Sequence, residues 1–304
     1  MPINSIAYNE KLTEELDRAL VQRSVTGFLA DNTLGAKFVG AKTVLIPDVT
    51  MQGLGDYDRE SGFVQGAVTV ANTPYTLSKD RGRSFQIDAE DADESGVSDL
   101  IGKVSGEFLR TCVIPEMDAY VLSKLGGLAA TEGHTVEGAP ATNAYAMLMD
   151  AIHRVQAAAG YDEELVAFAS GDFWEALQMS TEIQRVLTMS DFTRGEINTQ
   201  VASVNGVPVI PVVNSRMMSA YTFRDGVSAG AEAGGFAPEA NAKQIGLIVM
   251  PKRAASLVKK TEKTRIFSPA ENQNADAWKM DYRVYYDVFV KDSYKPAIYA
   301  HIGE

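Results

Sequence analysis

Three stretches of the 304-residue chain imitate ligand-binding loops. Gly96–Val104 (G-V-S-D-L-I-G-K-V) resembles a phosphate loop, but its glycines are one residue too far apart and Val104 replaces the magnesium-binding Ser or Thr. The run from Asp91 (D-A-D-E-S-G) imitates a calcium loop, yet Gly102 stands where a bidentate Glu is required, so helix capping is the better interpretation. Gly53–Asp58 (G-L-G-D-Y-D) lacks the third glycine of a dinucleotide fingerprint and precedes no helix. We therefore expect no cofactor at these loops.

Nucleophiles and metal ligands are equally sparse. The single cysteine, Cys112, lies in an apolar helical pattern that disfavours a thiolate, and we expect it to be a small core residue. None of the three histidines lies within four residues of another, and no G-x-S-x-G elbow occurs. His134 with Glu132 and Glu137 would make a surface metal site, but a solvated loop is the better interpretation. The sequence thus predicts no catalytic residue and no metal ligand.

Composition narrows the class of protein further. A hydrophobic content of 45% and a charged content of 22% are typical of a folded chain. The formal charge of -12 gives no general positive field, which argues against direct binding of nucleic acid. A single cysteine fits a reducing compartment. Because no stretch approaches the ~18 apolar residues of a membrane helix and no leader pattern opens the chain, we expect neither membrane insertion nor secretion.

The first part of the chain reads as two arms. Asn9–Leu29 carries leucines at helical spacing and predicts an amphipathic arm that must dock on its own subunit or on a neighbour. Strand patterns follow at Thr43–Asp48, Val68–Val70 and Pro74–Leu77, around a charged, glycine-rich stretch at Met51–Gly62. These features predict a long hairpin. An isolated hairpin is marginal in water, so this one needs a partner surface.

A long helix is the strongest periodic signal. The segment 80–88 predicts a turn and a strand with Phe85 and Ile87 on one face, and the acidic run Asp88–Ser95 then supplies helix-capping residues. Apolar residues recur at helical spacing up to Leu125, which at ~1.5 Å per residue gives a rod of roughly 45 Å. Pro115 should kink or split this helix, and Gly126-Gly127 should stop it. Its predicted core residues are Leu100, Val104, Phe108 and Val113.

The second half alternates helices and strands. A helix is expected at Asn143–Ala159, a buried strand at Leu165–Ser170, and a short helix at Gly171–Leu177 capped by Asp172. A hairpin follows at Val201–Val213, because Asn205-Gly206 is a favoured two-residue turn.

The last third is expected to begin with an exposed loop at Asp225–Ala242 and a buried strand at Gln244–Pro251. Residues Trp278–Lys291 alternate over about fourteen positions, far beyond the ~5 to 6 residues of an ordinary strand. One face of this strand needs cover, and we expect the long helix to pack on it.

This order of segments resembles the major capsid proteins of tailed bacteriophages, which have the HK97-like fold. Leu45–Arg59 and Pro74–Glu94 look like the extended loop of that family and its return into the long helix. Ile245–Ala254 looks like the strand and loop that lead back to the peripheral domain, and Arg283–Val290 looks like the long C-terminal strand.

The resemblance implies an α+β fold with an N-terminal arm, an extended β-hairpin loop, a long spine helix on a peripheral β-sheet, and an axial α/β domain. The corresponding ranges are 1–40 for the arm, 41–82 for the extended loop, 83–130 and 254–291 for the peripheral domain, and 131–253 and 292–304 for the axial domain. It also implies that the loop tip contacts a neighbouring subunit. The residues expected there are Asp56, Tyr57, Asp58, Arg59 and Glu60.

The function implied is structural: hexamers and pentamers of an icosahedral head around double-stranded DNA, in a virion assembled in the host cytoplasm. Because no helical pro-region precedes the loop strands, a separate scaffolding protein is expected, together with a portal and possible decoration proteins. DNA lies nearby without sequence-specific binding. No Lys occurs between Thr43 and Ser78, so a Lys–Asn cross-link from the loop is not expected. The alternatives are an encapsulin-like shell around protein cargo and a soluble α/β enzyme with an unrecognised site.

Overall fold

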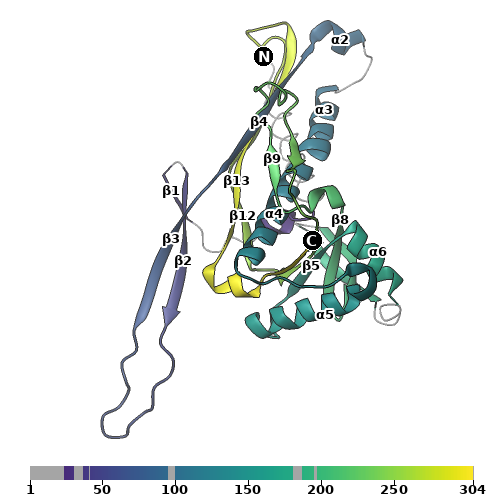
Figure 1. The fold of residues 1–304 in the computed structure, drawn as a ribbon. Coiled ribbons are helices and arrows are strands. Elements are labelled where there is room, and N and C mark those ends of the chain that lie inside the picture. Colours follow the sequence, from purple (N-terminus) through teal and green to yellow (C-terminus); the bar gives the residue numbers. More distant parts are fainter. Residues whose placement is uncertain are drawn as a thin grey trace.

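The computed structural model describes residues 24–30, 37–40, 42–94, 100–180, 187–194 and 197–303. Figure 1 shows a projecting hairpin, an elongated layer of helix and sheet, and a second sheet flanked by helices. The predicted arm helix at Asn9–Leu29 lies outside the described residues up to residue 23, and its last positions belong to a 3-10 turn, η1 (Gly27–Ala30).

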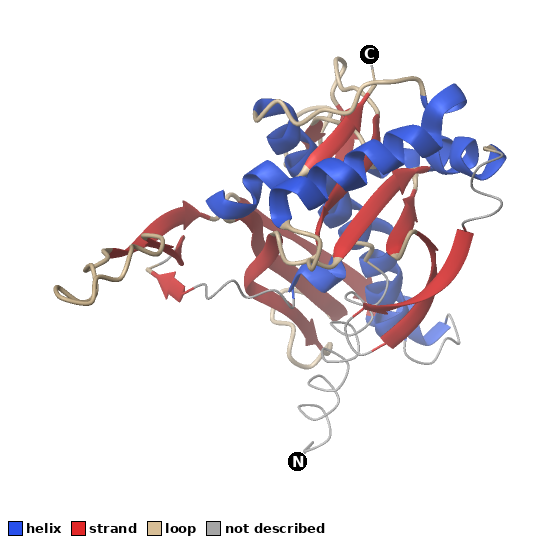
Figure 2. Ribbon diagram, turned by 90° about the horizontal axis from the view of Figure 1, so that it is seen from below, coloured by secondary structure: helices blue, strands red, loops and turns tan. Residues whose placement is uncertain are grey.

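The hairpin follows from the strand patterns near the start of the chain. Three antiparallel strands pair in the order β1-β2-β3: β1 (Lys37–Val39), β2 (Thr43–Met51) and β3 (Val68–Thr76). The predicted hairpin is confirmed, although β3 runs without a break through the two short strands expected there. From below, the hairpin projects from one side of the body (Figure 2).

The long helix is built from several pieces. The acidic run forms its own short helix, α2 (Ala89–Glu94), and the main rod comprises α3 (Leu100–Phe108), a π-helical turn η2 (Leu109–Val113) and α4 (Ile114–Thr131). Ile114 N–H bonds to the carbonyl of Leu109, five residues back, so the wider turn brings the chain to Pro115 without breaking the rod.

Neither of the two breaks predicted inside this helix is present. Pro115 does not split it, because the proline occupies the first turn of α4, where its missing N–H is not needed. Gly126-Gly127 does not stop it, since α4 continues to Thr131.

The peripheral sheet has the strand order β12-β13-β4 and lies along the helical rod (Figure 1). Its strands are β12 (Ala255–Phe267), β13 (Ala277–Val290) and β4 (Lys79–Asp88). The long predicted strand is confirmed as β13, and β4 is strand throughout, without the turn expected at its start. Met280, Tyr282 and Val284 join Val113 and Met117 of the rod in one hydrophobic core, as the alternation predicted.

The second sheet carries six strands in the order β14-β11-β5-β8-β7-β6. They are β14 (Tyr299–Ile302), β11 (Ile245–Pro251), β5 (Leu165–Ser170), β8 (Val207–Val212), β7 (Ile197–Val204) and β6 (Leu187–Arg194). Phe168 and Ile248 face the core shared with α4, while Leu247 and Val249 face helices α5 (Pro140–Ala159) and α6 (Gly171–Met179). Both faces are therefore covered, which explains the continuous apolar runs of β5 and β11.

Local signals in this half were mostly confirmed. Asn205 and Gly206 have φ of 51° and 79°, as the tight turn between β7 and β8 requires. Asp172 was wrongly expected to cap α6; the Ser170 hydroxyl accepts the hydrogen bond from the Phe173 N–H instead. The expected loop at 225–242 contains a short strand, β10 (Phe236–Pro238), paired with β9 (Tyr221–Phe223). Two 3-10 turns complete the described elements, η4 (Asn214–Arg216) and η5 (Asp292–Ala297). No helix in the described part of the chain is long and apolar enough to cross a membrane.

Candidate assembly interface

The hairpin is buried at its root and exposed at its tip. Val44 and Ile46 are 0% and 2% exposed and pack with Leu77 against Tyr285 and Phe289 of β13. Beyond this root the apolar side chains of both strands face solvent, among them Val49, Val68 and Val70. The root fixes the hairpin to the body, while its outer part has no core of its own.

The tip, residues 52–67 between β2 and β3, is locally ordered despite its exposure. A bridge joins Asp58 to Gly62, and the rings of Tyr57 and Phe63 lie 4.9 Å apart. Asp58 accepts a hydrogen bond from the Glu60 N–H, which lowers the pKa of the Asp58 carboxyl. The five residues expected to contact a neighbour, Asp56, Tyr57, Asp58, Arg59 and Glu60, are all exposed here.

A buried carboxylate holds the base of the hairpin. Asp287 of β13 accepts hydrogen bonds from the Ser78 N–H and hydroxyl at 3.0 and 2.8 Å, and from the Tyr120 hydroxyl at 2.8 Å. Lys124 of α4 adds an ion pair at 2.6 Å. Burial raises the pKa of Tyr120. Ser78 lies in the connection between β3 and β4. The cluster therefore joins the end of the hairpin to both α4 and β13.

Three cations alternate along the helix-facing side of β4 and bind the segment around β9 and β10. Lys79 Nζ lies 3.9 Å from the ring centre of Phe223, and burial, followed by the charge of Arg81, lowers the pKa of Lys79. Arg81 pairs with Glu116 at 2.6 Å and donates to the Arg224 carbonyl. Arg83 donates to the carbonyl of residue 232. The exposed segment predicted at 225–242 is thus fastened to the peripheral sheet.

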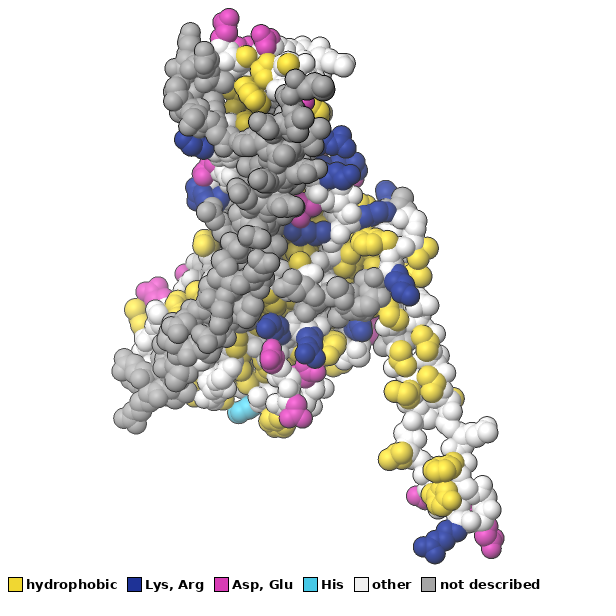
Figure 3. Space-filling view, turned by 180° about the vertical axis from the view of Figure 1, so that it is seen from behind, with side chains coloured by type: hydrophobic (Ala, Val, Ile, Leu, Met, Phe, Trp, Pro, Cys, Tyr) yellow, Lys and Arg dark blue, Asp and Glu magenta, His cyan; other side chains and the backbone are white. Residues whose placement is uncertain are grey.

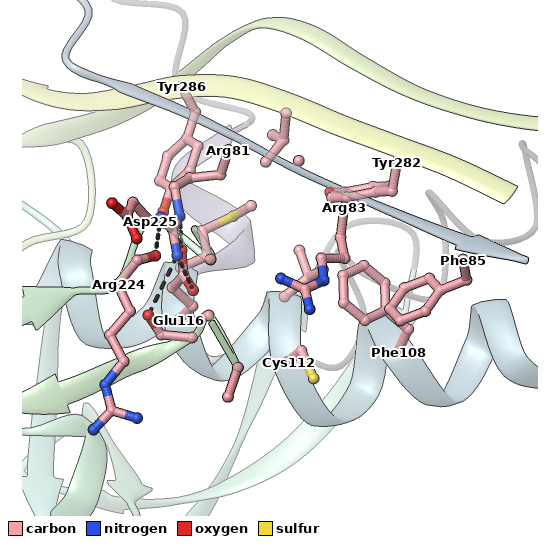
Figure 4. A pocket seen from close by; sticks show the side chains of 18 residues that line it. Arg81, Arg83, Phe85, Phe108, Cys112, Glu116, Arg224, Asp225, Tyr282 and Tyr286 are labelled. Carbon is pink, nitrogen blue, oxygen red and sulfur yellow. Dashed lines mark hydrogen bonds and ion pairs between the residues drawn. The ribbon is translucent and has the colours of Figure 1, made fainter. Parts of the chain in front are cut away.

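Beside these cations lies a pocket of ≈ 250 Å³ between the rod, β4 and β13 (Figure 4). Its aromatic lining comes from Phe85, Phe108, Tyr282 and Tyr286. Cys112 also lines it and is exposed, so its expected place in the core was wrong. The π-helical turn adds a residue to one turn of the rod, which shifts the phase of the side chains away from the regular helical pattern.

A second buried carboxylate fixes the described end of the N-terminal region. Asp118 of α4 is 0% exposed and accepts hydrogen bonds from the hydroxyls of Ser24 and Thr26 at 2.6 and 2.7 Å. Arg216 approaches the same carboxylate at 3.4 Å. Burial raises the pKa of Asp118, and the bonds from Ser24 and Thr26 oppose that rise. The residues expected to form an arm are therefore joined to the spine at Ser24–Thr26.

The side chains of three of the four residues expected on the core side of the long helix are described, and they are buried to different extents. Val113 is 9% exposed, and Phe108 is half-buried, with its ring 4.9 Å from Phe85 and 5.8 Å from Tyr282. Val104 is also half-buried, and the side chain of Leu100 lies outside the described residues.

Reasoning from the sequence missed Asp118 and Asp287. Each carboxylate stands within an otherwise apolar face of its element, and that is the one signal that pointed to them.

His134, which was expected in a solvated loop, is half-buried, and its ring stacks on that of Tyr299 with 4.9 Å between the ring centres. In the described ranges, no group of three His, Cys, Asp or Glu side chains is placed to hold a metal ion.

No family model matches the sequence, and no curated protein matches it. Solved structures do. The capsid of cyanophage P-SCSP1u aligns with a TM-score of 0.56 and 13% identity, over 88% of this chain and 85% of that one. The mature capsid of bacteriophage PhiM1 aligns with a TM-score of 0.54 and 14% identity, over 86% and 82%. The chain has the HK97-like capsid fold. A virus-like particle from Pyrococcus furiosus shares this fold over 97% of this chain and 99% of its own, at 12% identity and a TM-score of 0.52.

Proposed function

We propose that the chain is a major capsid protein whose copies self-assemble into the hexamers and pentamers of an icosahedral phage head around double-stranded DNA. The exposed hairpin carries this proposal. It is rooted in the core but presents Met51, Leu54 and Phe63 to solvent at 73%, 106% and 87% exposure. Apolar side chains gathered on a projecting element mark an interaction surface, and neighbouring copies in a shell would cover it (Figure 3).

The proposed domain boundaries follow the architecture of the capsid family. Residues 1–40 form an arm, 41–82 the extended loop, 83–130 and 254–291 the peripheral domain, and 131–253 with 292–304 the axial domain. In this scheme Asp56–Glu60 contact a neighbouring subunit, while Val104, Phe108 and Val113 with Leu100 form the core side of the spine. The subunit itself is structural, without a catalytic centre.

The proposed partners are other copies of the chain, a separate scaffolding protein, a portal and possible decoration proteins. The formal charge of -12 suits a surface that lies near packaged DNA without binding it, because a negative chain does not attract phosphates. The protein is accordingly a virion component assembled in the host cytoplasm.

Replacing 51–62 by a short turn tests the proposal, because the exposed tip adds little to the core of the subunit. The variant should unfold cooperatively like the unaltered chain but give only monomers in gel filtration and no shells or capsomer rings in negative-stain microscopy. Shells formed by the variant would contradict the role of the hairpin. Small, defined oligomers of the unaltered chain, with no shell under any condition, would favour an enzyme.

A cellular shell around protein cargo, like an encapsulin, is the second candidate. It keeps the closed shell that the alignment with a virus-like particle from Pyrococcus furiosus supports and changes only the contents. Particles purified from the native source separate the two: nuclease-protected double-stranded DNA supports a phage head, and a stoichiometric enclosed protein supports a cargo shell.

A further inference from the structure

The pocket between the helical rod, β4 and β13 has the size and the walls of a small-molecule site. The ring of Phe108 lies edge to face with those of Phe85 and Tyr282, and Val113 and Val284 also line the pocket. An apolar cavity of ~150 Å³ accepts a benzene ring. The ≈ 250 Å³ of this pocket therefore leaves room for one substituted ring or for two fused rings. Aromatic walls favour an aromatic guest through edge-to-face packing.

Arg83 brings to this pocket a charge that no carboxylate of the described residues pairs with. It extends from β4 toward the rod (Figure 4), and both of its Nη atoms donate to the Glu232 carbonyl at 3.3 Å. Arg81, by contrast, binds both carboxylate oxygens of Glu116 and two backbone carbonyls. A guanidinium has five N–H donors in a planar fork that matches a carboxylate. Arg83 thus keeps donors for an anion, whereas Arg81 is already occupied.

The segment between β9 and β10 fixes the place of this guanidinium. Gly226 has a φ of +77°, and a Cβ there would lie 2.7 Å from Nη1 of Arg83, so a side chain at this position would displace the guanidinium. The close approach lets the segment hold Arg83 through the carbonyl of residue 232. A cation that is positioned before the ligand arrives loses little conformational entropy on binding.

The charges that line the pocket favour a monoanion. Three arginines line it, Arg81, Arg83 and Arg224, together with two carboxylates, Glu116 and Asp225. Hydrogen bonds from the Ser228 hydroxyl and from two backbone N–H groups lower the pKa of Asp225 to about 2, so this carboxyl is ionised at neutral pH. One positive charge is left over. A single carboxylate balances that charge, whereas a dianionic phosphate would exceed it.

We propose that this pocket binds a small aromatic carboxylate, with the ring between Phe85, Phe108 and Tyr282 and the carboxylate on Arg83. The ligand has one substituted ring or two fused rings. The inference goes beyond the proposed shell function and does not rest on it.

The only cysteine of the chain, Cys112, lines the pocket, is exposed, and reports on its occupancy. The test measures alkylation of Cys112 by iodoacetamide, a neutral reagent, in the full chain at a concentration where gel filtration shows monomer. 2-Naphthoate should protect the thiol in a saturable way, and the concentration that gives half-protection measures its affinity. 2-Naphthamide, the neutral analogue, should bind at least about tenfold more weakly, because it lacks the charge-assisted hydrogen bonds to Arg83.

Two variants assign the anion site to a residue. Arg83→Met should weaken protection by 2-naphthoate about tenfold or more and should reduce its preference over 2-naphthamide. Arg253→Met, which removes an exposed arginine outside the pocket, is the matched control and should leave the half-protection concentration unchanged.

Each outcome decides the proposal. A preference for 2-naphthoate that is lost in Arg83→Met and kept in Arg253→Met supports it. No protection by 2-naphthoate up to the millimolar range overturns it, and so does equal protection by 2-naphthoate and 2-naphthamide. That comparison uses the unaltered chain and decides the matter even if Arg83→Met fails to fold. Assembly is not measured, so failure of this proposal leaves the shell function standing.

Discussion

Lys124 Nζ lies 2.6 Å from Oδ1 of Asp287, and the Asp287 side chain is 1% exposed whereas that of Lys124 is 42% exposed. The pair joins the spine helix to the long strand at the point where the hairpin leaves the body. Only the lysine can regain water if the pair is broken. Removing the lysine should therefore lower the free energy of unfolding, because it leaves a buried carboxylate without its cation.

Lys124→Met should lower the free energy of unfolding by about 3 kcal/mol, the lower end for loss of one partner of a buried pair, because Ser78 and Tyr120 still donate to Asp287. Arg154→Met is the matched control. It breaks the half-exposed pair with Asp150, which is worth about 0.3 to 0.5 kcal/mol. Urea titration of both variants measures the difference, and equal losses would show that Asp287 does not depend on Lys124.

Two adjacent glycines of α4 should respond oppositely to alanine. A Cβ at Gly126 would lie 2.5 Å from Cδ1 of Ile245, which is fully buried, so overpacking should reduce stability by about 1 to 3 kcal/mol. A Cβ at Gly127 meets nothing within 4 Å, and Gly127→Ala should stabilise the helix by about 0.5 to 1 kcal/mol. Thermal unfolding of the two single variants compares them directly. Similar shifts in both would argue against the close approach of α4 to β11.

Periodic segments were predictable because burial imposes the period on local sequence. Met147, Leu148 and Val155 of α5 were assigned correctly for this reason, as was the alternation of β13 up to Val284. From Tyr285 to Val290 the prediction was wrong, because the hairpin root covers the second face of the strand. The clusters around Asp118 and Asp287 were not predicted, because their partners lie 92 to 209 positions away and no local pattern records them. The π-helical turn was also hidden, and with it the outward position of Cys112, since an added residue changes the helical phase without changing composition.

Phe108→Ala should cost about 3 kcal/mol, the lower end for a truncated aromatic residue, because the ring is half-buried between Phe85 and Tyr282. Phe63→Ala removes the same atoms at a tip position that is 87% exposed and should change stability by less than about 0.5 kcal/mol. Chemical denaturation of the unassembled subunit measures both. A loss for Phe63→Ala as large as that for Phe108→Ala would show that the tip belongs to a core.

The charged residues of the tip should contribute to assembly through screened ion pairs. Changing Asp56, Asp58, Arg59 and Glu60 together to Ala should lower shell yield at low salt and weaken its dependence on salt, because each exposed pair contributes little but recurs at every interface. Light scattering at rising salt concentration measures the yield. Unchanged yield and unchanged salt dependence would mean that these side chains are solvated in the shell.

His301 should make the fold sensitive to acid. Burial lowers the pKa of this ring below its ordinary 6.5, and Nε2 lies 3.2 Å from the Gly138 carbonyl. Below pH 6.5 the unfolded chain binds a proton that the folded chain does not yet bind. The contribution of the His301 ring to the free energy of unfolding is therefore fully present above pH 6.5 and is lost as the pH falls from 6.5 through the folded pKa. The loss is at most about 1.4 kcal/mol per pH unit for this single proton. His301→Gln removes the titrating group and should flatten the loss of melting temperature between pH 6.5 and pH 5. His153→Gln changes an exposed ring in α5 and should leave the slope as in the unaltered chain. If both variants keep the full slope, carboxylates rather than His301 govern acid unfolding.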